Sequence, residues 1–285
     1  MPAWSYKEPL RLAEHLTEEG TLSDKGLGAL VQFVGHALEV AEDKGCEEIH
    51  SFATSAVRDA TNTDEVLDAV YAQTGIRIDV LPGEDEARLT FLAVRRWFGW
   101  SSGRLAVFDI GGGSLEIATG ADEAPENAWS LPLGAARLTR EHFATGRPDE
   151  LQLRKLNKHI RAEIARTAGA MLRNGAPDRA VATSKTFRSL ARICGAAPSG
   201  EGPFVRRALP RDELDRWLPK LIDMSRDEIG DLPGVSQDRA HQVVTGAMIA
   251  AACMDLFAIE ELEICPWALR EGVILEHLDR MSVLG

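Results

Sequence analysis

Along this chain, short apolar runs alternate with segments in which the apolar residues have the spacing of a helix. Apolar residues three and four positions apart predict a helix over residues 24–44, with Ser23 as its N-cap. Short apolar runs predict strands over residues 48–53 and 76–81, with a helix over 63–73 between them. Strands that alternate with helices are typical of an α/β protein with much parallel pairing.

The same alternation restarts after residues 100–103 (WSSG), which we take as a domain boundary. Before it we expect a short strand at 10–13, a loop at 54–59 and a helix from 83 to about 98. After it we expect a loop at 196–204, strands at 105–109, 114–120, 127–132, 179–182 and 262–265, and helices at 135–143, 149–173, 185–193, 211–229, 239–257 and 268–281.

One stretch carries candidate chemistry: LAVFDIGGGSLEIAT, residues 105–119. Its pattern predicts a strand, a tight glycine turn and a return strand. Successive amides in such a turn form an anion site, and a carboxylate on each side suits a hydrated divalent cation that bridges to phosphate. The alternative is an ordinary glycine-rich hairpin with surface acids. The residues concerned are Asp109, Gly111, Gly112, Gly113, Ser114 and Glu116.

The composition of the chain and the absence of certain motifs argue against several classes of protein and binding site. The chain has no GxxxxGK[ST] run and no GxGxxG run, so neither a Walker loop nor a Rossmann dinucleotide site is supported. Its 285 residues carry a formal net charge of −12, which argues against nucleic-acid binding and requires any anion site to be local. Four scattered cysteines without a CxxC pair indicate reduced thiols in a cytoplasmic protein. No run reaches transmembrane length and no signal-peptide pattern is present, so we expect no membrane partner.

The run DIGGGSLE at residues 109–116 resembles the second phosphate motif of the superfamily that holds sugar kinases, actin and the heat-shock chaperones. The resemblance is closest to the exopolyphosphatase/guanosine pentaphosphate phosphohydrolase (Ppx/GppA) family and covers nearly the whole chain. Five further stretches carry it: FATSAVRDA (52–60), GEDEARLTFLAVRRW (83–97), SLPLGAARLTREHF (130–143), VATSKTFRSLARI (181–193) and ICPWALREGVI (264–274).

The resemblance implies an α/β fold of two ribonuclease-H-like domains of the actin-like ATPase superfamily, with the ligand in the cleft between them. We place the domains at residues 1–102 and 103–285, with the final helix packing back on the first. The family's first phosphate motif, of the form DxGSNxxxL, is absent from this sequence. We therefore expect the first domain to lack its N-terminal hairpin and to expose a sheet edge or apolar surface. A start assigned too late, a shortened chain and a natural variant that binds without turnover all remain open.

The resemblance also implies roles for individual residues. Glu86, the last acid of the run at 84–86, matches the general base, whereas acids in a first helical turn also simply favour the helix dipole. Arg58 matches a phosphate-clamping arginine, with pairing to Asp59 as the alternative, and Ser55 is a second phosphate donor. Asp109 and Glu116 are assigned to Mg²⁺ or Mn²⁺ and to the organisation of water.

Two further cations are candidates for phosphate binding. Arg137 either lies near the cleft or simply begins a helix, and Lys185 lies in the first turn of an expected helix, where anions bind favourably. The run Thr183-Ser184-Lys185-Thr186 stands where many family members have glycines, so a nucleotide base is crowded and polyphosphate is favoured. Arg188, Arg192, Arg206 and Arg207 either line a channel for a polyanion or are solvated surface charges.

The function expected from the resemblance is hydrolysis of the terminal phosphate of inorganic polyphosphate. The alternatives are a guanosine pentaphosphate 5′-phosphohydrolase and a catalytically impaired protein that binds polyphosphate or guanosine pentaphosphate or tetraphosphate. We expect a homodimer, both from the family and from the unpaired sheet edge.

Overall fold

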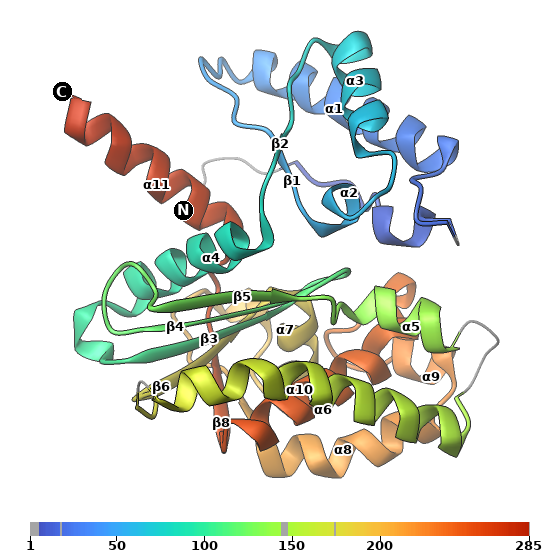
Figure 1. Cartoon of the computed structure of the whole chain (residues 1–285), viewed down its shortest axis with the longest axis vertical. Helices are drawn as coiled ribbons and strands as arrows, with labels where there is room; N and C mark the ends of the chain where they lie inside the picture. The colour runs from blue at the N-terminus through green and yellow to red at the C-terminus, as the bar shows by residue number, and fades with distance from the viewer. Residues whose placement is uncertain (1–5, 18, 144–147, 174, 285) are drawn as a thin grey trace. The chain divides into compact units, whose positions relative to one another are not determined.

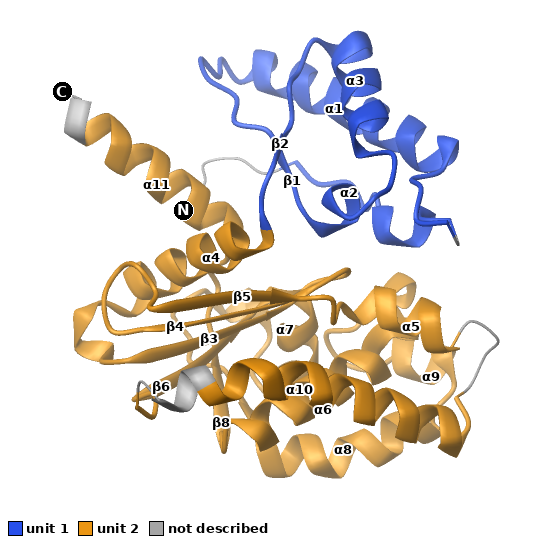
Figure 2. Ribbon diagram, in the orientation of Figure 1, with its two compact units in different colours: residues 1–82 blue, residues 83–285 orange. Residues whose placement is uncertain are grey.

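The computed structural model describes residues 6–17, 19–143, 148–173 and 175–284 (Figure 1). The chain divides into two compact units, residues 1–82 and 83–285 (Figure 2). The sequence analysis placed a domain boundary at residues 102/103, after α4 (Gly83–Phe98), whereas the two compact units meet before α4. The reason is that α4 buries its apolar face against the sheet of unit 2.

Unit 1 begins with a 3-10 turn, η1 (Leu12–His15), where the sequence predicted a strand at 10–13. Leu10 and Leu12 pack on the apolar cluster of this unit instead of pairing with another strand. The helix α1 (Asp24–Asp43) starts as predicted, and the Ser23 hydroxyl accepts a hydrogen bond from the Gly26 N–H at 3.4 Å.

The remainder of unit 1 is built from short elements. A short helix, α2 (Ser55–Arg58), replaces the predicted loop at 54–59, and α3 (Thr63–Thr74) confirms the predicted helix. Two strands, β1 (Phe52–Ala53) and β2 (Asp79–Val80), pair in parallel and form the sheet of unit 1 in the residues described. Beside them lies an apolar cavity of about 410 Å³, with Leu30, Phe33, Val34, Phe52 and Ile78 among its lining residues.

The sheet of unit 2 has the order β5-β4-β3-β6-β8-β7 among the described residues. Its strands are β3 (Leu105–Ile110), β4 (Leu115–Gly120), β5 (Asn127–Leu131), β6 (Arg179–Thr183), β7 (Ala208–Pro210) and β8 (Glu261–Ile264). The central strands β3, β6 and β8 are parallel, and the others pair antiparallel. Sequence analysis missed β7, a three-residue edge strand inside a region rich in Pro and Gly.

Helices cover both faces of this sheet. α4 packs on β3, β4 and β5, and α11 (Leu269–Leu284) packs on α4 (Figure 1). The predicted return of the final helix onto the first domain is thus a contact with α4 inside unit 2. The other helices are α5 (Ala135–Phe143), α6 (Glu150–Arg173), α7 (Ser184–Ile193), α8 (Arg211–Asp223), α9 (Arg226–Gly230) and α10 (Val243–Leu256), with 3-10 turns η2 (Trp100–Ser102), η3 (Ser199–Glu201) and η4 (Gln237–Gln242).

Ion pairs and close packing join α11 to α4. Arg88 donates to Asp85 at 3.1 Å and to Glu276 of α11 at 2.7 Å. At Gly272 a Cβ atom would come within 2.0 Å of the Leu89 carbonyl oxygen, so only glycine allows this approach. Among the described residues, no helix combines the length and the apolar character that crossing a lipid bilayer requires.

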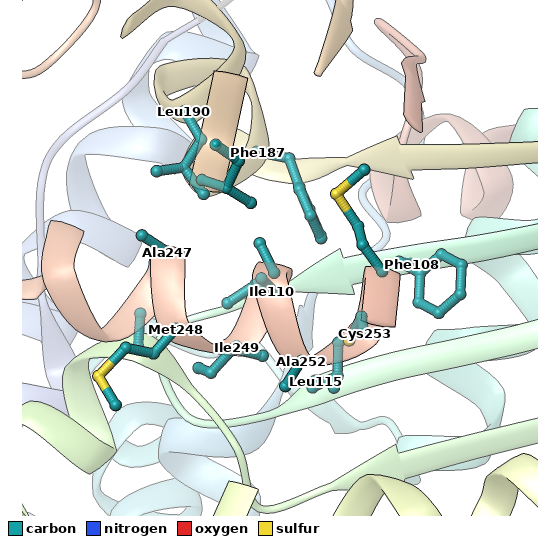
Figure 3. Packing of buried hydrophobic residues seen from close by; sticks show 14 of the residues in the cluster. Phe108, Ile110, Leu115, Phe187, Leu190, Ala247, Met248, Ile249, Ala252 and Cys253 are labelled. Carbon is teal, nitrogen blue, oxygen red and sulfur yellow. The ribbon is translucent and has the colours of Figure 1, made fainter. Parts of the chain in front are cut away.

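Successive residues of β3 face opposite sides of the sheet, and this alternation determines the face on which Asp109 lies. Phe108 and Ile110 belong to the large core formed with α7 and α10, together with Leu115 of β4 (Figure 3). Leu105 and Val107 belong to the smaller cluster formed with α4. Because side chains alternate between the two faces of a strand, Asp109 lies on the face that α4 covers.

Candidate functional site

Four polar residues form one row across the sheet of unit 2. Asp109 of β3 lies directly opposite Glu116 of β4 on one side and Thr183 of β6 on the other. Glu116 in turn lies opposite Ser130 of β5. Side chains in register on neighbouring strands lie next to each other on the same face. The two acids that flank the glycine turn are therefore cross-strand neighbours.

Glu116 is buried and is held by hydroxyl groups. The Ser130 Oγ donates to its Oε1 at 2.8 Å, and Ser114 donates a second hydrogen bond. Burial, with the negative charges of Asp109 and Glu86, nevertheless raises the pKa of Glu116 to about 8. Without a cation this carboxyl group retains its proton near neutral pH.

Asp109 has a different set of neighbours. Burial raises its pKa to about 6, against the lowering effects of the Arg188 charge and of a hydrogen bond from Ser184. Both groups come from α7, which begins where β6 ends. The opposing effects leave Asp109 easier to ionise than Glu116.

The glycine turn is closed by its own backbone and by the start of α5. The Gly111 N–H donates to the Ser114 carbonyl at 2.9 Å, so this amide is used inside the turn. The carbonyls of Gly111 and Gly112 accept from the N–H groups of Ala135 and Arg137, at 3.0 and 2.9 Å. In a trans peptide the N–H points opposite to the carbonyl, so the N–H groups of Gly112 and Gly113 point away from α5.

Gly134 permits this contact between α5 and the turn. A Cβ atom at this position would lie 2.2 Å from the Gly113 carbonyl carbon and 2.3 Å from the Gly112 oxygen. No side chain fits at such distances, so the loop before α5 must be glycine here. The orientation of the turn thus depends on a glycine outside the motif itself.

Glu86 is the buried acid of the run at the start of α4. Its side chain is 6% exposed, whereas Glu84 is exposed and Asp85 pairs with Arg88. The Glu86 charge contributes to the raised pKa of Glu116, which places the two groups near each other. Of the three acids, Glu86 alone combines burial with proximity to the row.

The donor set fits a hard divalent cation. Asp109 and Glu116 offer carboxylate oxygens side by side, and a cation between them would offset the repulsion that holds the pKa of Glu116 high. The ligand atoms of Asp109, Glu116 and Glu86 do not all lie within 4.8 Å of one another. This spacing favours two of the acids as ligands and leaves Glu86 for another role.

The candidate residues of unit 1 lie in and next to α2. Ser55 is buried at the first position of the helix. Arg58 donates from Nε to Asp59 at 3.2 Å and from Nη1 to the Leu81 carbonyl at 3.0 Å. The pairing with Asp59 that the sequence analysis considered is therefore present. A phosphate that binds Arg58 would share its guanidinium with Asp59 and the Leu81 carbonyl.

The cations of unit 2 are placed in first helical turns. The Arg137 side chain donates to Glu141 at 3.1 Å, while its backbone holds the glycine turn. The Lys185 Nζ donates to the Ser236 hydroxyl at 3.2 Å. Both residues thus lie on helices that adjoin the row, α5 and α7.

The four arginines considered for a polyanion channel separate into two groups. Arg192 donates to the Ala196 carbonyl at 2.8 Å, Arg206 pairs with Glu261, and Arg207 donates to four backbone carbonyls. Arg188 is exposed, acts on Asp109 through its charge, and makes no hydrogen bond or ion pair with the described residues. Only Arg188 has the position and the open donors of an anion ligand.

Sequence reasoning missed Thr183, Ser130 and Ser184 as partners of the two acids. Thr183 and Ser130 become visible only once strand register is known. Ser184 lies at the strand-to-helix turn that the sequence analysis singled out, but its effect on the pKa of Asp109 needs the fold.

A model of the Ppx/GppA phosphatase family matches residues 4–281 of the chain. Exopolyphosphatase 1 of Mycobacterium tuberculosis is 50% identical over 98% of this chain and 81% of its own length. Exopolyphosphatase 1 of Mycobacterium leprae is 49% identical over 98% of the chain and 82% of its length. A guanosine-5′-triphosphate,3′-diphosphate pyrophosphatase of Photobacterium profundum is 26% identical over 96% of the chain and 54% of its length.

Solved structures support the fold. A Ppx/GppA family member of Aquifex aeolicus aligns with a TM-score of 0.76 at 22% identity, over 95% of this chain and 87% of its own. An exopolyphosphatase of Cytophaga hutchinsonii aligns with a TM-score of 0.82 at 20% identity, over 92% and 84%. These alignments confirm the predicted α/β fold, which the chain shares with the solved Ppx/GppA proteins.

Proposed function

Because this chain belongs to the Ppx/GppA phosphatase family, we propose that it is an exopolyphosphatase, which hydrolyses the terminal phosphoanhydride bond of inorganic polyphosphate. The observation that carries the assignment is the 50% identity, over 98% of the chain, to a protein named exopolyphosphatase 1. The glycine turn between two acids gives this activity a physical basis, since it combines an anion site with carboxylates for a cation.

A second candidate is removal of the 5′ γ-phosphate from guanosine pentaphosphate. The relative from Photobacterium profundum supports it, at 26% identity and over about half of that protein's length. The side chains of Ser184, Lys185 and Thr186 in place of glycines weigh against a bound base. A protein that binds polyphosphate or guanosine tetraphosphate without turnover is the non-enzymatic alternative.

Glu86 is the residue we assign to proton transfer. A water oxygen attacks the terminal phosphorus while the Glu86 carboxylate accepts a proton from that water. The bridging P–O bond breaks, its electron pair stays on the shortened chain, and orthophosphate is released. Burial of Glu86 beside the row supports this assignment, because a general base must lie at the reacting centre before its pKa matters.

Backbone amides and cations would hold the phosphate. The carbonyls of Gly111 and Gly112 both accept from α5, so the N–H groups that follow them point away from that helix, and the Gly111 N–H closes the turn. Phosphoryl transfer depends mainly on such positioning and on neutralised charge. The side chains that we propose to add donors are Ser114, Ser55, Arg58, Arg137 and Lys185.

Asp109 and Glu116 would hold the divalent cation, Mg²⁺ or Mn²⁺. A bound cation supplies positive charge next to the phosphoryl group that is transferred. Both acids must be ionised to bind it, so binding releases the proton that Glu116 retains near neutral pH. The hydrogen bond from Ser130 would orient the Glu116 carboxylate toward the cation.

We further propose a cytoplasmic homodimer. The four cysteines are free thiols, which suits a reducing compartment. Light scattering coupled to size-exclusion chromatography tests the dimer.

Phosphate release from long-chain polyphosphate with Mg²⁺ tests the function. Wild type should release phosphate, Glu86→Gln should lose at least about a hundredfold in kcat, and the matched control Glu84→Gln, in the same turn but exposed, should retain full activity. Guanosine pentaphosphate as a competitor separates the two substrates. Binding of polyphosphate without release would overturn the hydrolase assignment, and equal loss in both variants would overturn the role of Glu86.

A further inference from the structure

We propose that the surface of unit 2 around Phe204 is the face through which this chain pairs with a second copy of itself. We call this surface the aromatic face, and it consists of Trp97, Trp267, Phe204, Arg179, Arg206, Glu261 and Glu263. The inference rests on the homodimer proposed above, to which it gives a location, and is independent of the proposed hydrolysis.

Helix α4 covers only part of its side of the sheet. Among the described residues, α4 packs on β3, β4 and β5, while the helices that pack on β6, β8 and β7 belong to the core on the opposite side. Arg179 lies opposite Leu105, and Glu263 lies opposite Val181, so both charged residues are on the α4 side. This half of the sheet therefore carries charged side chains where the other half carries a packed helix.

Three aromatic side chains from separate parts of the chain meet beside these charges. The Phe204 ring stacks on the Trp97 indole, with 5.3 Å between ring centroids and 15° between ring planes. Trp267 meets Trp97 edge-on, also at 5.3 Å. Phe204 is nevertheless 85% exposed. An aromatic ring that stacks on one neighbour and leaves most of its surface in water is typical of an interface anchor.

The loop that carries Phe204 is fixed by one guanidinium group. Arg207 donates to the backbone carbonyls of Ala197, Pro198, Gly202 and Val205, at 2.6–3.0 Å. Groups that are already ordered before association lose less conformational entropy when they bind. Phe204 is therefore presented as a preformed contact.

The charges of the aromatic face indicate which partner it fits. Arg179 pairs with Glu263 at 2.9 Å, and Arg206 pairs with Glu261, so the face is neutral in a chain whose net charge is −12. A polyanion would require excess positive charge here. Net negative charge makes two copies repel each other, so they approach most readily where their surfaces are neutral.

A two-fold axis would make these charges complementary between copies. In such an interface the same surface of each copy meets the other, so Arg206 of one copy can face Glu261 of the other. Both side chains are exposed and therefore accessible to a second partner. Continuation of the sheet between copies is less favourable, because the edge strand β7 has three residues and ends at Pro210, which has no N–H to donate.

Removal of the anchor is the first test. Sedimentation velocity of the full chain over a dilution series gives the dissociation constant of the dimer. Phe204→Ala should raise it at least about 30-fold, as expected for an interface anchor. Leu151→Ala is the matched control, since Leu151 is a 60% exposed hydrophobic residue of α6 outside the aromatic face. It should dimerise as wild type does.

A charge exchange tests whether the partner is a second copy. Arg206→Glu and Glu261→Arg should each be monomeric alone, because like charges then meet across the axis. An equimolar mixture of the two variants should form dimers again, because every acid at these positions of one copy then faces an arginine of the other. Mixing cannot repair a defect of folding, so this rescue reports a contact between copies.

The inference is supported if Phe204→Ala weakens the dimer and the mixture restores it. A wild type that stays monomeric would overturn the inference and leave the face to a different partner. A dimer that persists in Phe204→Ala, or a mixture that does not associate, would also overturn it. Phosphate release is measured on the same samples, and its absence from a wild-type dimer would reject only the proposed hydrolase.

Discussion

Asp109 on β3 and Glu116 on β4 lie directly opposite each other, so a half-buried and a buried carboxyl group share one face of the sheet. Burial raises the pKa of Asp109 to about 6 and, with the charges of Asp109 and Glu86, that of Glu116 to about 8. The fold is therefore least stable when both groups are ionised and no cation is bound.

Stability of the metal-free protein should fall as pH rises. The folded-state pKa of Glu116 lies above its ordinary value of 4.5, so the folded state holds this proton more tightly than the unfolded state. The stabilising effect is full below about pH 4.5 and is lost as pH rises toward about 8. Denaturant unfolding in EDTA should show a loss of a few kcal/mol over this range, since one pKa unit corresponds to about 1.4 kcal/mol.

Glu116→Gln should flatten this dependence, because the amide does not titrate, and Mg²⁺ should reduce it in wild type. Glu84→Gln, at an exposed position, should keep the wild-type slope. A wild-type slope in Glu116→Gln would assign the effect to other groups.

Gly134→Ala should disable the glycine turn. The new methyl group would overlap the Gly112 and Gly113 backbone at 2.2–2.4 Å, and backbone cannot move aside as a flexible side chain can. We expect a loss of about 1–3 kcal/mol in unfolding free energy and a large fall in kcat/KM. The control Gly28→Ala meets no atom within 4 Å and should stabilise α1 by up to about 1 kcal/mol. Equal behaviour of the two variants would contradict the role of Gly134.

Arg188→Gln should weaken substrate binding without weakening metal binding. Its guanidinium makes no ion pair with the described residues and acts on Asp109 only through charge, so its donors are open to a phosphate. A charged hydrogen bond contributes about 1.5–3 kcal/mol, so KM for polyphosphate should rise about tenfold or more. Removing a positive charge beside Asp109 should leave Mn²⁺ affinity equal or higher. Arg154→Gln, an exposed residue paired with Glu150, is the matched control, and a KM equal to wild type would exclude Arg188 as a ligand.

Thiol labelling should single out one cysteine. Cys46 is exposed, whereas burial raises the pKa of Cys194 and Cys265 to about 12 and that of Cys253 still higher. Because the thiolate is the reactive form, a thiol reagent at pH 8 should modify the native protein once and the denatured protein four times. Native Cys46→Ser should not react, and rapid labelling of a second native thiol would show that its site opens.

The hairpin around the glycine turn was predictable, because few structures other than a hairpin fit two alternating apolar segments separated by three glycines. The register of β3 with β6 was not predictable, because the pairing of Asp109 with Thr183 joins strands more than seventy residues apart in the sequence. The need for glycine at position 134 was not predictable either, because it arises from the close approach of the glycine turn to this position. Local pattern thus gave the elements and the acids, whereas the partners of those acids depend on tertiary contacts.

The domain boundary taken from the sequence and the division between the two compact units lie on opposite sides of α4. The break at 100–103 marks a change in composition, but the apolar face of α4 belongs to the sheet that follows it. The strand predicted at 10–13 is absent because its leucines, which are partly buried, pack on the apolar cluster of unit 1 and do not pair with another strand.

The contact between Arg88 and Glu276 joins positions 188 residues apart. The helix that carries Glu86 therefore gains this support only late in translation, when α11 has left the ribosome. A nascent chain, or a product of early termination before α11, contains Glu86, the glycine turn, Asp109 and Glu116, yet lacks the part of the packing on α4 that α11 supplies. Hydrolysis is consequently expected from the finished polypeptide rather than from its active-site segments.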